Sequence, residues 1–212
     1  MKKAFASLFI LAAGVLVSAY GLFTGVGSAA ASPGTGSAEP SATPAKTKKP
    51  VAAERELVLT DGEFDGKELI RSDAEWRSEL SGPAFYVLRQ EGTERPYTSP
   101  LNDVKKDGTF YCEACGLALF SSKAKFDSGT GWPSFYEPIF KKNVKEKIDR
   151  SLDEERIEIE CARCHSHLGH VFDDGPAALG GLRYCINGAS LRFVPLAQMD
   201  AQGYGAWKNR AG

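Results

Sequence analysis

Two identical pairs of cysteines constrain the fold of this 212-residue chain more than any other feature. Cys112 and Cys115 form one Cys-x-x-Cys motif, and Cys161 and Cys164 form a second one after 45 intervening residues. Each motif can bring two thiolates to one tetrahedral ion, so together they predict a four-cysteine zinc site. Four sulfurs leave no open coordination position, so such a zinc would stabilise the fold without catalysing a reaction. Two disulfides are the alternative, whereas a redox-active motif would need a βαβ pattern that surrounds neither pair.

The overall composition is that of an ordinary globular domain. Charged residues make up 25% of the chain and hydrophobic residues 42%, which is typical of folded proteins. Lys and Arg number 26 against 27 Asp and Glu, and this balance argues against a nucleic-acid-binding protein. Only one long apolar run is present, so the sequence is not that of a protein with several membrane spans.

Residues 1–31 are predicted to be a signal peptide or an N-terminal membrane anchor. Lys2 and Lys3 precede an uncharged stretch over 4–31 that ends in small residues at 28–31, which is typical of a secretory signal. Because about 20 apolar residues can span a bilayer, an uncleaved anchor is the alternative. Both interpretations predict an exported protein, periplasmic or otherwise extracytoplasmic. An uncleaved leader would tether it to the inner membrane, and no other membrane contact is expected.

A change in composition separates this leader from the folded part of the chain. Residues 32–54 contain four prolines among Gly, Ser, Thr, Ala and Lys. Such a segment cannot bury enough apolar surface to offset its ordering entropy, so we expect a disordered linker. The folded domain is predicted over 55–200, and the Gly-rich end, 201–212, is predicted to be a flexible tail.

Two short helices followed by short strands are expected inside this domain. Ser72 and Glu75 form a capping-box pattern that predicts a helix ending at Gly82-Pro83, and 84–90 could form a second helix. The expected strands are 110–112, 117–120, 156–160, 171–172, 182–187 and 190–194. The alternation of polar and apolar residues over 156–160 predicts a strand with one solvent-facing side. The fold class is therefore mainly β: a small antiparallel core, as two packed sheets or a barrel, with short N-terminal helices and a four-cysteine zinc site.

Cys185 is the one cysteine that the two motifs leave over. Strand alternation places Arg183, Cys185 and Asn187 on one face. A nearby guanidinium favours thiolate over thiol, and an amide offers hydrogen bonds. An intermolecular bridge or an inert buried thiol are the alternatives. The polar neighbours of this cysteine, Arg183 and Asn187, favour a reactive thiolate.

All three histidines, His165, His167 and His170, lie just after the second cysteine motif, and Asp174 follows. With four sulfurs on the zinc, these imidazoles are free for acid–base chemistry or for ordering a pocket. They could equally be alternative metal ligands, His165 above all, or surface groups. Spacing alone does not separate these interpretations.

Trp132 lies in a glycine-rich loop over 128–135. An indole at such a position is either an ordinary core residue or one wall of a small apolar pocket. These residues alone predict a β domain that is stabilised by zinc and carries a thiolate site. They do not identify the substrate.

Five runs of residues, read in order, resemble the B family of peptide methionine sulfoxide reductases. They are Gly92-Thr93-Glu94-Arg95-Pro96, Phe110-Tyr111-Cys112-x-x-Cys115-Gly116, 126–135, 161–176 and Arg183-Tyr184-Cys185-Ile186-Asn187. The resemblance covers about 70–195 and leaves out the leader and the linker. It implies reduction of the R epimer of methionine sulfoxide, free or within proteins, on a mainly β fold with a structural Zn²⁺ and no organic cofactor.

The resemblance also implies a role for each matching residue. Cys185 matches the nucleophile, which becomes a sulfenic acid as methionine leaves. The other catalytic positions are His167, His170, Asn187, Arg183 and Asp174. Trp132, together with Phe172, matches the residues that contact the substrate's methyl group. His165 falls at a position to which the family gives no role.

Thr130 departs from the pattern of many members, which carry a second, resolving cysteine there. Thr130 cannot form a disulfide, so the resemblance implies a single-cysteine enzyme. An external thiol, thioredoxin-like or of low molecular weight, would then reduce the sulfenic acid. We expect a monomer that repairs oxidised exported proteins. A zinc-ribbon binding module and a thiol peroxidase are the rival interpretations.

Overall fold

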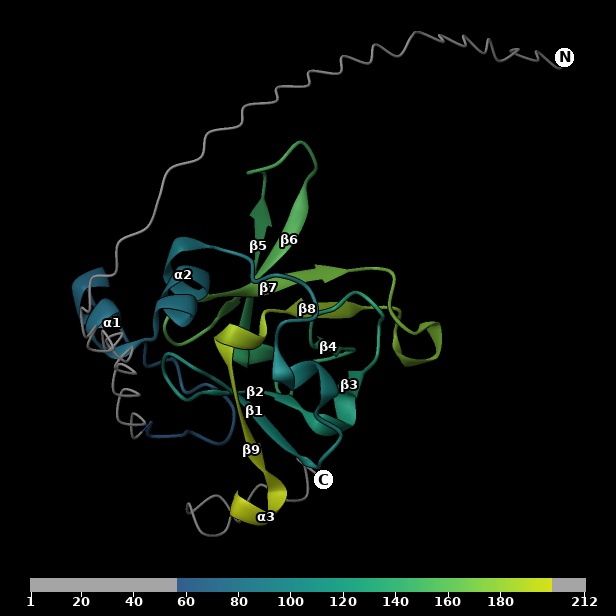
Figure 1. Cartoon of the computed structure of the whole chain (residues 1–212), viewed down its shortest axis with the longest axis horizontal. Coiled ribbons are helices and arrows are strands. Elements are labelled where there is room, and N and C mark those ends of the chain that lie inside the picture. The colour runs from purple at the N-terminus through teal and green to yellow at the C-terminus, as the bar shows by residue number, and fades with distance from the viewer. Residues whose placement is uncertain (1–56, 200–212) are drawn as a thin grey trace, which may run out of the picture. The chain divides into compact units, whose positions relative to one another are not determined.

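The computed structural model describes residues 57–199 (Figure 1). The leader over 1–31, the linker over 32–54 and the tail over 201–212 lie outside the described residues, so these boundaries stay predictions. Within 57–199, no helix combines the length and the apolar character that a bilayer span requires.

Two α-helices precede the strands, as the sequence predicts. Helix α1 (Asp73–Glu79) begins after Ser72, whose side chain and that of Glu75 form the expected capping box. Helix α2 spans Gly82–Gln90. The pair Gly82-Pro83, expected only to end the first helix, also begins the second one. Proline is tolerated there because the N–H groups of a helix's first turn need no partner within the helix.

The strands form two antiparallel sheets. One has the order β2-β1-β9, and the other has the order β3-β4-β8-β7-β6-β5. The first contains β1 (Gly108–Cys112), β2 (Ala118–Ser121) and β9 (Leu191–Pro195). The second contains β3 (Lys125–Phe126), β4 (Ser134–Phe135), β5 (Val144–Asp149), β6 (Arg156–Cys161), β7 (His167–Phe172) and β8 (Arg183–Ile186).

Short helical segments precede, connect and follow these strands. The 3-10 turns are η1 (Pro100–Asp103), η2 (Ser122–Ala124), η3 (Lys141–Asn143), η4 (Ala177–Leu179) and η5 (Gly188–Ser190), and α3 (Leu196–Met199) follows β9. The turn η5 matters most for the site, because it immediately follows Asn187 at the end of β8.

Aromatic side chains join the two sheets. The ring of Phe135 in β4 lies 5.0 Å from that of Phe110 in β1 and 4.4 Å from that of Phe120 in β2. The ring of Tyr184 in β8 lies 5.9 Å from that of Phe120. All four residues are buried, so the hydrophobic core sits between two packed sheets. The predicted fold class, mainly β with short N-terminal helices, is confirmed.

All six predicted strands are present, and β3, β4 and β5 are additional. Strands β3 and β4 have two residues each, which is too short to show a periodic pattern. Strand β5 lies at the edge of its sheet and is mostly exposed. An edge strand of this kind needs few apolar residues, so its sequence lacks the alternation that predicts a strand.

Strand β6 was expected to turn its glutamates toward solvent, and this expectation is wrong for Glu158. Its side chain is buried, and each of its two carboxylate oxygens contacts a different side chain. Glu158 Oε1 lies 2.6 Å from His167 Nδ1, and Oε2 lies 3.0 Å from Lys147 Nζ. A carboxylate is tolerated in the interior when its oxygens are paired in this way.

Candidate functional site

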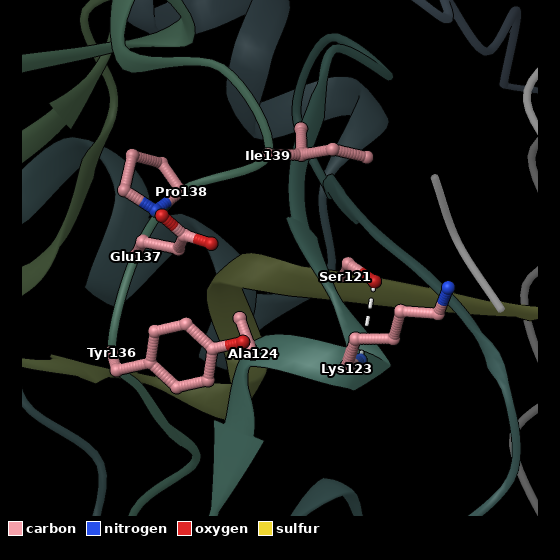
Figure 2. Close-up of a pocket in the computed structure, with 7 residues that line it drawn as sticks. All are labelled: Ser121, Lys123, Ala124, Tyr136, Glu137, Pro138 and Ile139. Carbon is pink, nitrogen blue, oxygen red and sulfur yellow. Dashed lines mark hydrogen bonds between the residues drawn. The ribbon is translucent and has the colours of Figure 1, made fainter. Parts of the chain in front are cut away.

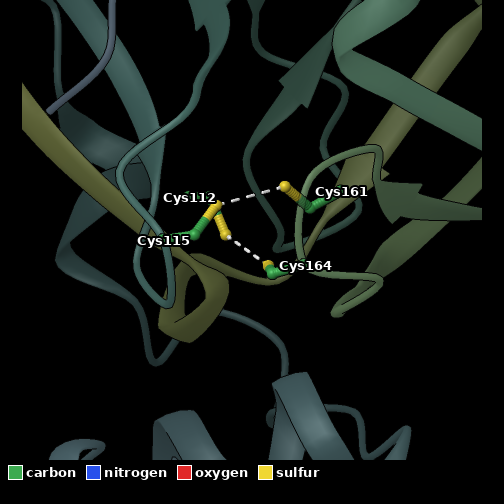
Figure 3. A group of neighbouring side chains, drawn as sticks. All are labelled: Cys112, Cys115, Cys161 and Cys164. Atoms are coloured by element: carbon green, nitrogen blue, oxygen red, sulfur yellow. Dashed lines mark hydrogen bonds between the residues drawn. The ribbon is translucent and has the colours of Figure 1, made fainter. Parts of the chain in front are cut away.

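The four cysteines of the two motifs form one buried cluster (Figure 3). Their sulfurs all lie within 4.8 Å of one another. Cys112 Sγ is 3.7 Å from Cys164 Sγ, and Cys115 Sγ is 3.5 Å from Cys161 Sγ. Four Zn–S bonds of ~2.3 Å would place sulfurs ~3.8 Å apart. The cluster therefore fits a tetrahedral metal ion, and all four cysteines are free rather than disulfide-bonded.

The pKa values of these thiols also favour a bound cation. Burial raises the pKa of Cys112 and Cys161, whereas hydrogen bonds from the neighbouring thiols lower that of Cys164. A divalent ion supplies the charge that holds such thiols as thiolates. His165 is not part of the cluster: its Nε2 lies 3.1 Å from Glu68 Oε1 at the surface. The sequence alternative of His165 as a ligand is therefore not supported.

Cys185 lies in a separate small cavity of about 140 Å³. Five of the residues predicted from the sequence share this cavity, namely Cys185, His170, Asn187, Trp132 and Phe172. The cavity is completed by Thr93, Arg156 and Gly169, for which the sequence predicted no role. A thiol, an imidazole, an amide and two aromatic rings thus meet at one concave site, a combination typical of a small-molecule or side-chain pocket.

The register of β7 and β8 brings the thiol and the imidazole together. His170 and Cys185 are directly opposite each other, and on the other side of β8 Ser134 is opposite Cys185. Directly opposite residues share a face of the sheet. Gly169 permits the close approach of the two strands, because a Cβ there would lie 2.1 Å from the carbonyl oxygen of Cys185.

Burial is the largest influence on the Cys185 thiol, and it raises the pKa above the ordinary value. The positive charge of Arg183 and hydrogen bonds from Thr130 and Arg183 lower it, while Asp174 raises it. Arg183 lowers the pKa of Cys185 as predicted from the sequence, but burial has the larger effect. Strand alternation reveals the neighbouring charge and not the depth of burial.

Alkylation of the protein by iodoacetamide tests this balance. The rate follows the thiolate fraction of Cys185, so it should still be rising with pH at the ordinary thiol pKa. Arg183→Met removes a charge that lowers the pKa and should slow alkylation several-fold at pH 8. Asp174→Asn removes a charge that raises the pKa and should act in the opposite direction. Rates that are equal in the two variants would contradict this account.

The carboxylate of Asp149 holds His170. Its Nε2 lies 2.8 Å from Asp149 Oδ2, and Arg156 Nη2 donates to the same oxygen at 2.6 Å. Hydrogen bonds from Ser151 first, then from His170 and Arg156, lower the pKa of Asp149. Burial lowers the pKa of His170, against the effect of Asp149. Burial thus favours the neutral imidazole, in which Nε2–H donates to Asp149 and Nδ1 is left as an acceptor.

His167 lies beside His170 but does not line the cavity. The two rings are 5.4 Å apart, and the side chain of His167 is 3% exposed. Its Nδ1 donates to Glu158, whose pKa is lowered by His167 and Lys147 although burial alone would raise it. Its Nε2 is buried without a hydrogen-bond partner among the described residues. His167 is thus placed to support His170, and its contact with substrate stays a prediction.

Arg183 and Asp174 form a pair next to the cavity. Arg183 Nε and Nη2 each donate to Asp174 at 2.8 Å, one to each carboxylate oxygen. The guanidinium carbon also lies 4.5 Å from the centre of the Phe172 ring. Neither charged residue lines the cavity. Both residues influence the pKa of Cys185 by charge, and Arg183 also does so by a hydrogen bond. Only Arg183 contacts the ring of Phe172.

The hydroxyl group of Thr130 lies near the sulfur of Cys185. Thr130 Oγ1 lies 4.0 Å from Cys185 Sγ and 2.9 Å from Ser128 Oγ. Ser128 Oγ in turn lies 2.7 Å from Ser134 Oγ. These hydroxyl groups lead from β4 to the thiol. Thr130 occupies the position at which a resolving cysteine is common in the family that the sequence resembles.

Other hollows exist, but they lack comparable chemistry. One of about 390 Å³ is shown in Figure 2. It is lined by Ser121, Lys123, Ala124, Tyr136, Glu137, Pro138 and Ile139. None of these is a cysteine or a histidine, so the smaller cavity at Cys185 is the better candidate for a reactive site.

Comparisons with known proteins agree with this site. The SelR domain family matches residues 80–195. A peptide methionine sulfoxide reductase MsrB from Thiobacillus denitrificans is 54% identical over 125 residues, covering 59% of this chain and 94% of the relative. The MsrB proteins of Methanosarcina barkeri and Hahella chejuensis are 53% and 51% identical, covering 60% and 58% of this chain and 89% and 88% of each relative.

A solved structure, the Mis18 'Yippee-like' domain, is 21% identical and covers 42% of this chain and 96% of that one. Its TM-score of 0.34 is too low to support any statement about this fold. The matched SelR segment, by contrast, contains both cysteine motifs and Cys185. The chain therefore belongs to the SelR-domain family of methionine sulfoxide reductases of type B, and it is an enzyme that reduces methionine sulfoxide.

Proposed function

We propose that this enzyme reduces the R epimer of methionine sulfoxide, free or within proteins, with Cys185 as the attacking group. The observation that carries the proposal is the cavity itself, in which a thiol faces an imidazole, an amide and an indole. A sulfoxide sulfur carries an oxygen, a methyl group and a longer carbon chain. A pocket with three chemically different sides can bind only one epimer of the sulfoxide in the reactive orientation.

In the proposed reaction, the sulfur of Cys185 attacks the sulfoxide sulfur, and one oxygen atom passes from substrate to enzyme. A thiol and a sulfoxide become a sulfenic acid and a thioether, so atoms and electrons balance. Because burial raises the pKa of Cys185, the thiol brings the proton that the sulfoxide oxygen needs. His170 Nδ1, left available by the bond of Nε2 to Asp149, moves that proton from sulfur to oxygen.

Reduction of racemic methionine sulfoxide with dithiothreitol tests the activity and the epimer together. The proposal expects turnover to stop when half of the racemate is consumed, leaving the S epimer. Continued consumption beyond half would contradict the R selectivity. A binding module would consume none, and a peroxidase would prefer a hydroperoxide.

We propose that an external thiol regenerates the enzyme. Among the described cysteines, only Cys185 lies outside the metal cluster, and Thr130 stands beside it. The first external thiol forms a mixed disulfide with Cys185 and releases water. A second thiol frees Cys185 and leaves as the oxidised disulfide. A thioredoxin-like protein or a low-molecular-weight thiol could supply both.

Mass spectrometry after stoichiometric oxidation by substrate, without reductant, tests the sulfenic acid. Cys185 should gain the mass of one oxygen atom, and no internal disulfide should form. In Thr130→Cys, the same treatment should instead join positions 130 and 185, because the two side chains are already close. A disulfide between Cys185 and the metal cluster in the unaltered protein would refute the single-cysteine mechanism.

We further propose that Zn²⁺ is the resident metal of the four-cysteine cluster, because four sulfur ligands suit zinc. We also propose that the enzyme is a monomer. The leader over 1–31 supports export, to the periplasm or another extracytoplasmic site, where oxidised proteins would be the substrates. Comparing the mature N-terminus with the encoded one distinguishes a cleaved signal from an anchor.

A further inference from the structure

We propose that Glu94 is a positioning residue that holds two walls of the cavity, Asn187 and Trp132, in place around Cys185. Its backbone N–H donates to Asn187 Oδ1 at 3.0 Å, and its carbonyl oxygen accepts from Trp132 Nε1 at 3.1 Å. Asn187 and Trp132 both line the cavity. They come from segments 55 residues apart in sequence, and the backbone of one residue, Glu94, binds both.

The carboxylate of Glu94 anchors this residue to the end of β8. Oε1 accepts from the Gly188 N–H at 2.6 Å, and Oε2 accepts from the Ala189 N–H at 2.8 Å. These N–H groups begin η5, which has no cap from the side chain of Asn187. A carboxylate that accepts two backbone N–H groups makes strong, charge-assisted bonds. Glu94 is therefore tied to the segment that immediately follows Cys185.

The consequence for Asn187 is a fixed amide orientation. Its oxygen accepts from Glu94, and its Nδ2 donates to the carbonyl oxygen of Leu168 at 3.0 Å. A flipped amide would place its NH₂ group against the Glu94 N–H, so the orientation is determined. The second hydrogen on Nδ2 is the group left for the cavity. Asn187 thus offers a donor, which is what a sulfoxide oxygen accepts.

The consequence for Trp132 is similar. Because its N–H is bonded to Glu94, the indole presents only carbon atoms to the cavity. An apolar surface of this kind suits a methyl group. Glu94 therefore determines which wall is polar and which is apolar, without touching the substrate. The assignment of oxygen to Asn187 and methyl to Trp132 rests on the proposed function.

Substitution of Glu94 in the full-length protein tests this role. Glu94→Ala removes both anchoring acceptors, and kcat/KM for methionine sulfoxide should fall by about 10- to 100-fold, as expected for a displaced site. Glu94→Gln keeps the length and one acceptor, so its loss should be smaller. Alkylation of Cys185 by iodoacetamide should change less than about twofold, because the groups that tune the thiol do not contact Glu94.

The Trp132 indole gives a direct readout. Its N–H resonance, assigned by its loss in Trp132→Phe, should exchange faster with solvent in Glu94→Ala. Glu75→Gln is the matched control: Glu75 also accepts a backbone N–H at a helix start, but in α1. This control should leave kcat/KM and the indole exchange unchanged.

Two results would overturn the proposal. One is a Glu94→Ala enzyme that retains kcat/KM within twofold. The other is a joint loss of turnover, bound zinc and normal Cys185 alkylation, which would show a general structural role. If Glu94→Ala behaves normally while Cys185→Ser is inactive, the role of Glu94 fails and the proposed function stands.

Discussion

Cys185→Ser should abolish methionine sulfoxide reduction, lowering kcat/KM by more than about 10³-fold. Serine has nearly the same shape, but its hydroxyl is a far weaker nucleophile at neutral pH than a thiol. It also cannot form a sulfenic acid, which is the product that carries the oxygen away from the substrate. Turnover of methionine sulfoxide with dithiothreitol, followed by methionine release, measures the loss.

The same variant should keep its fold and its metal. Cys185 lies in a different place from the four-cysteine cluster, and no described cluster sulfur depends on it. Bound zinc and the melting temperature should therefore match those of the unaltered protein. A Cys185→Ser protein that retains more than a small fraction of its turnover would overturn the proposed mechanism, because no other described cysteine lies outside the cluster.

The chemistry-bearing residues of this protein could be predicted from sequence because they sit in short local patterns. Cysteine spacing predicted the four-sulfur cluster, which is now seen as one buried group. Alternation around Cys185 placed it beside Asn187, and both line the cavity. Each of these inferences needs only a few neighbouring positions in the chain.

The supporting residues could not be found in this way, because their partners are distant in sequence. Asp149 binds His170 across 21 positions, and Glu94 binds Gly188 across 94. Glu158 was expected to face solvent, since a charged residue in an alternating strand usually does. Only the fold reveals that His167 and Lys147 meet it inside the protein.

Burial was the other quantity that local patterns missed. Arg183 two residues before Cys185 suggested a thiolate, but the fold places the sulfur deep enough for desolvation to dominate. The effect of a charge can be predicted from spacing, whereas the depth of burial depends on how the sheets pack. The resemblance to a known family supplied the substrate class, which the residues alone left open.

Cys161→Ser should have the largest effect on stability, because it removes one of the four sulfurs of the proposed zinc site. Cys112 ends β1 in one sheet and Cys161 ends β6 in the other, so a bound zinc ties the two sheets together. Structural zinc contributes ~10–16 kcal/mol in small domains, which is comparable to the whole stability of a typical protein. The melting temperature should fall by more than about 10 °C, with most of the zinc lost.

Calorimetry and metal analysis measure these two changes, and Cys185→Ser serves as the matched cysteine control that keeps both. A chelator added to the unaltered protein should reproduce the loss of stability, and added zinc should reverse it only while four sulfurs are present. Turnover should fall in parallel, because β6 pairs with β7, which carries His170 opposite Cys185. A Cys161→Ser protein that melts normally without metal would show that the aromatic core alone holds the sheets together, and the cluster would then have no structural role.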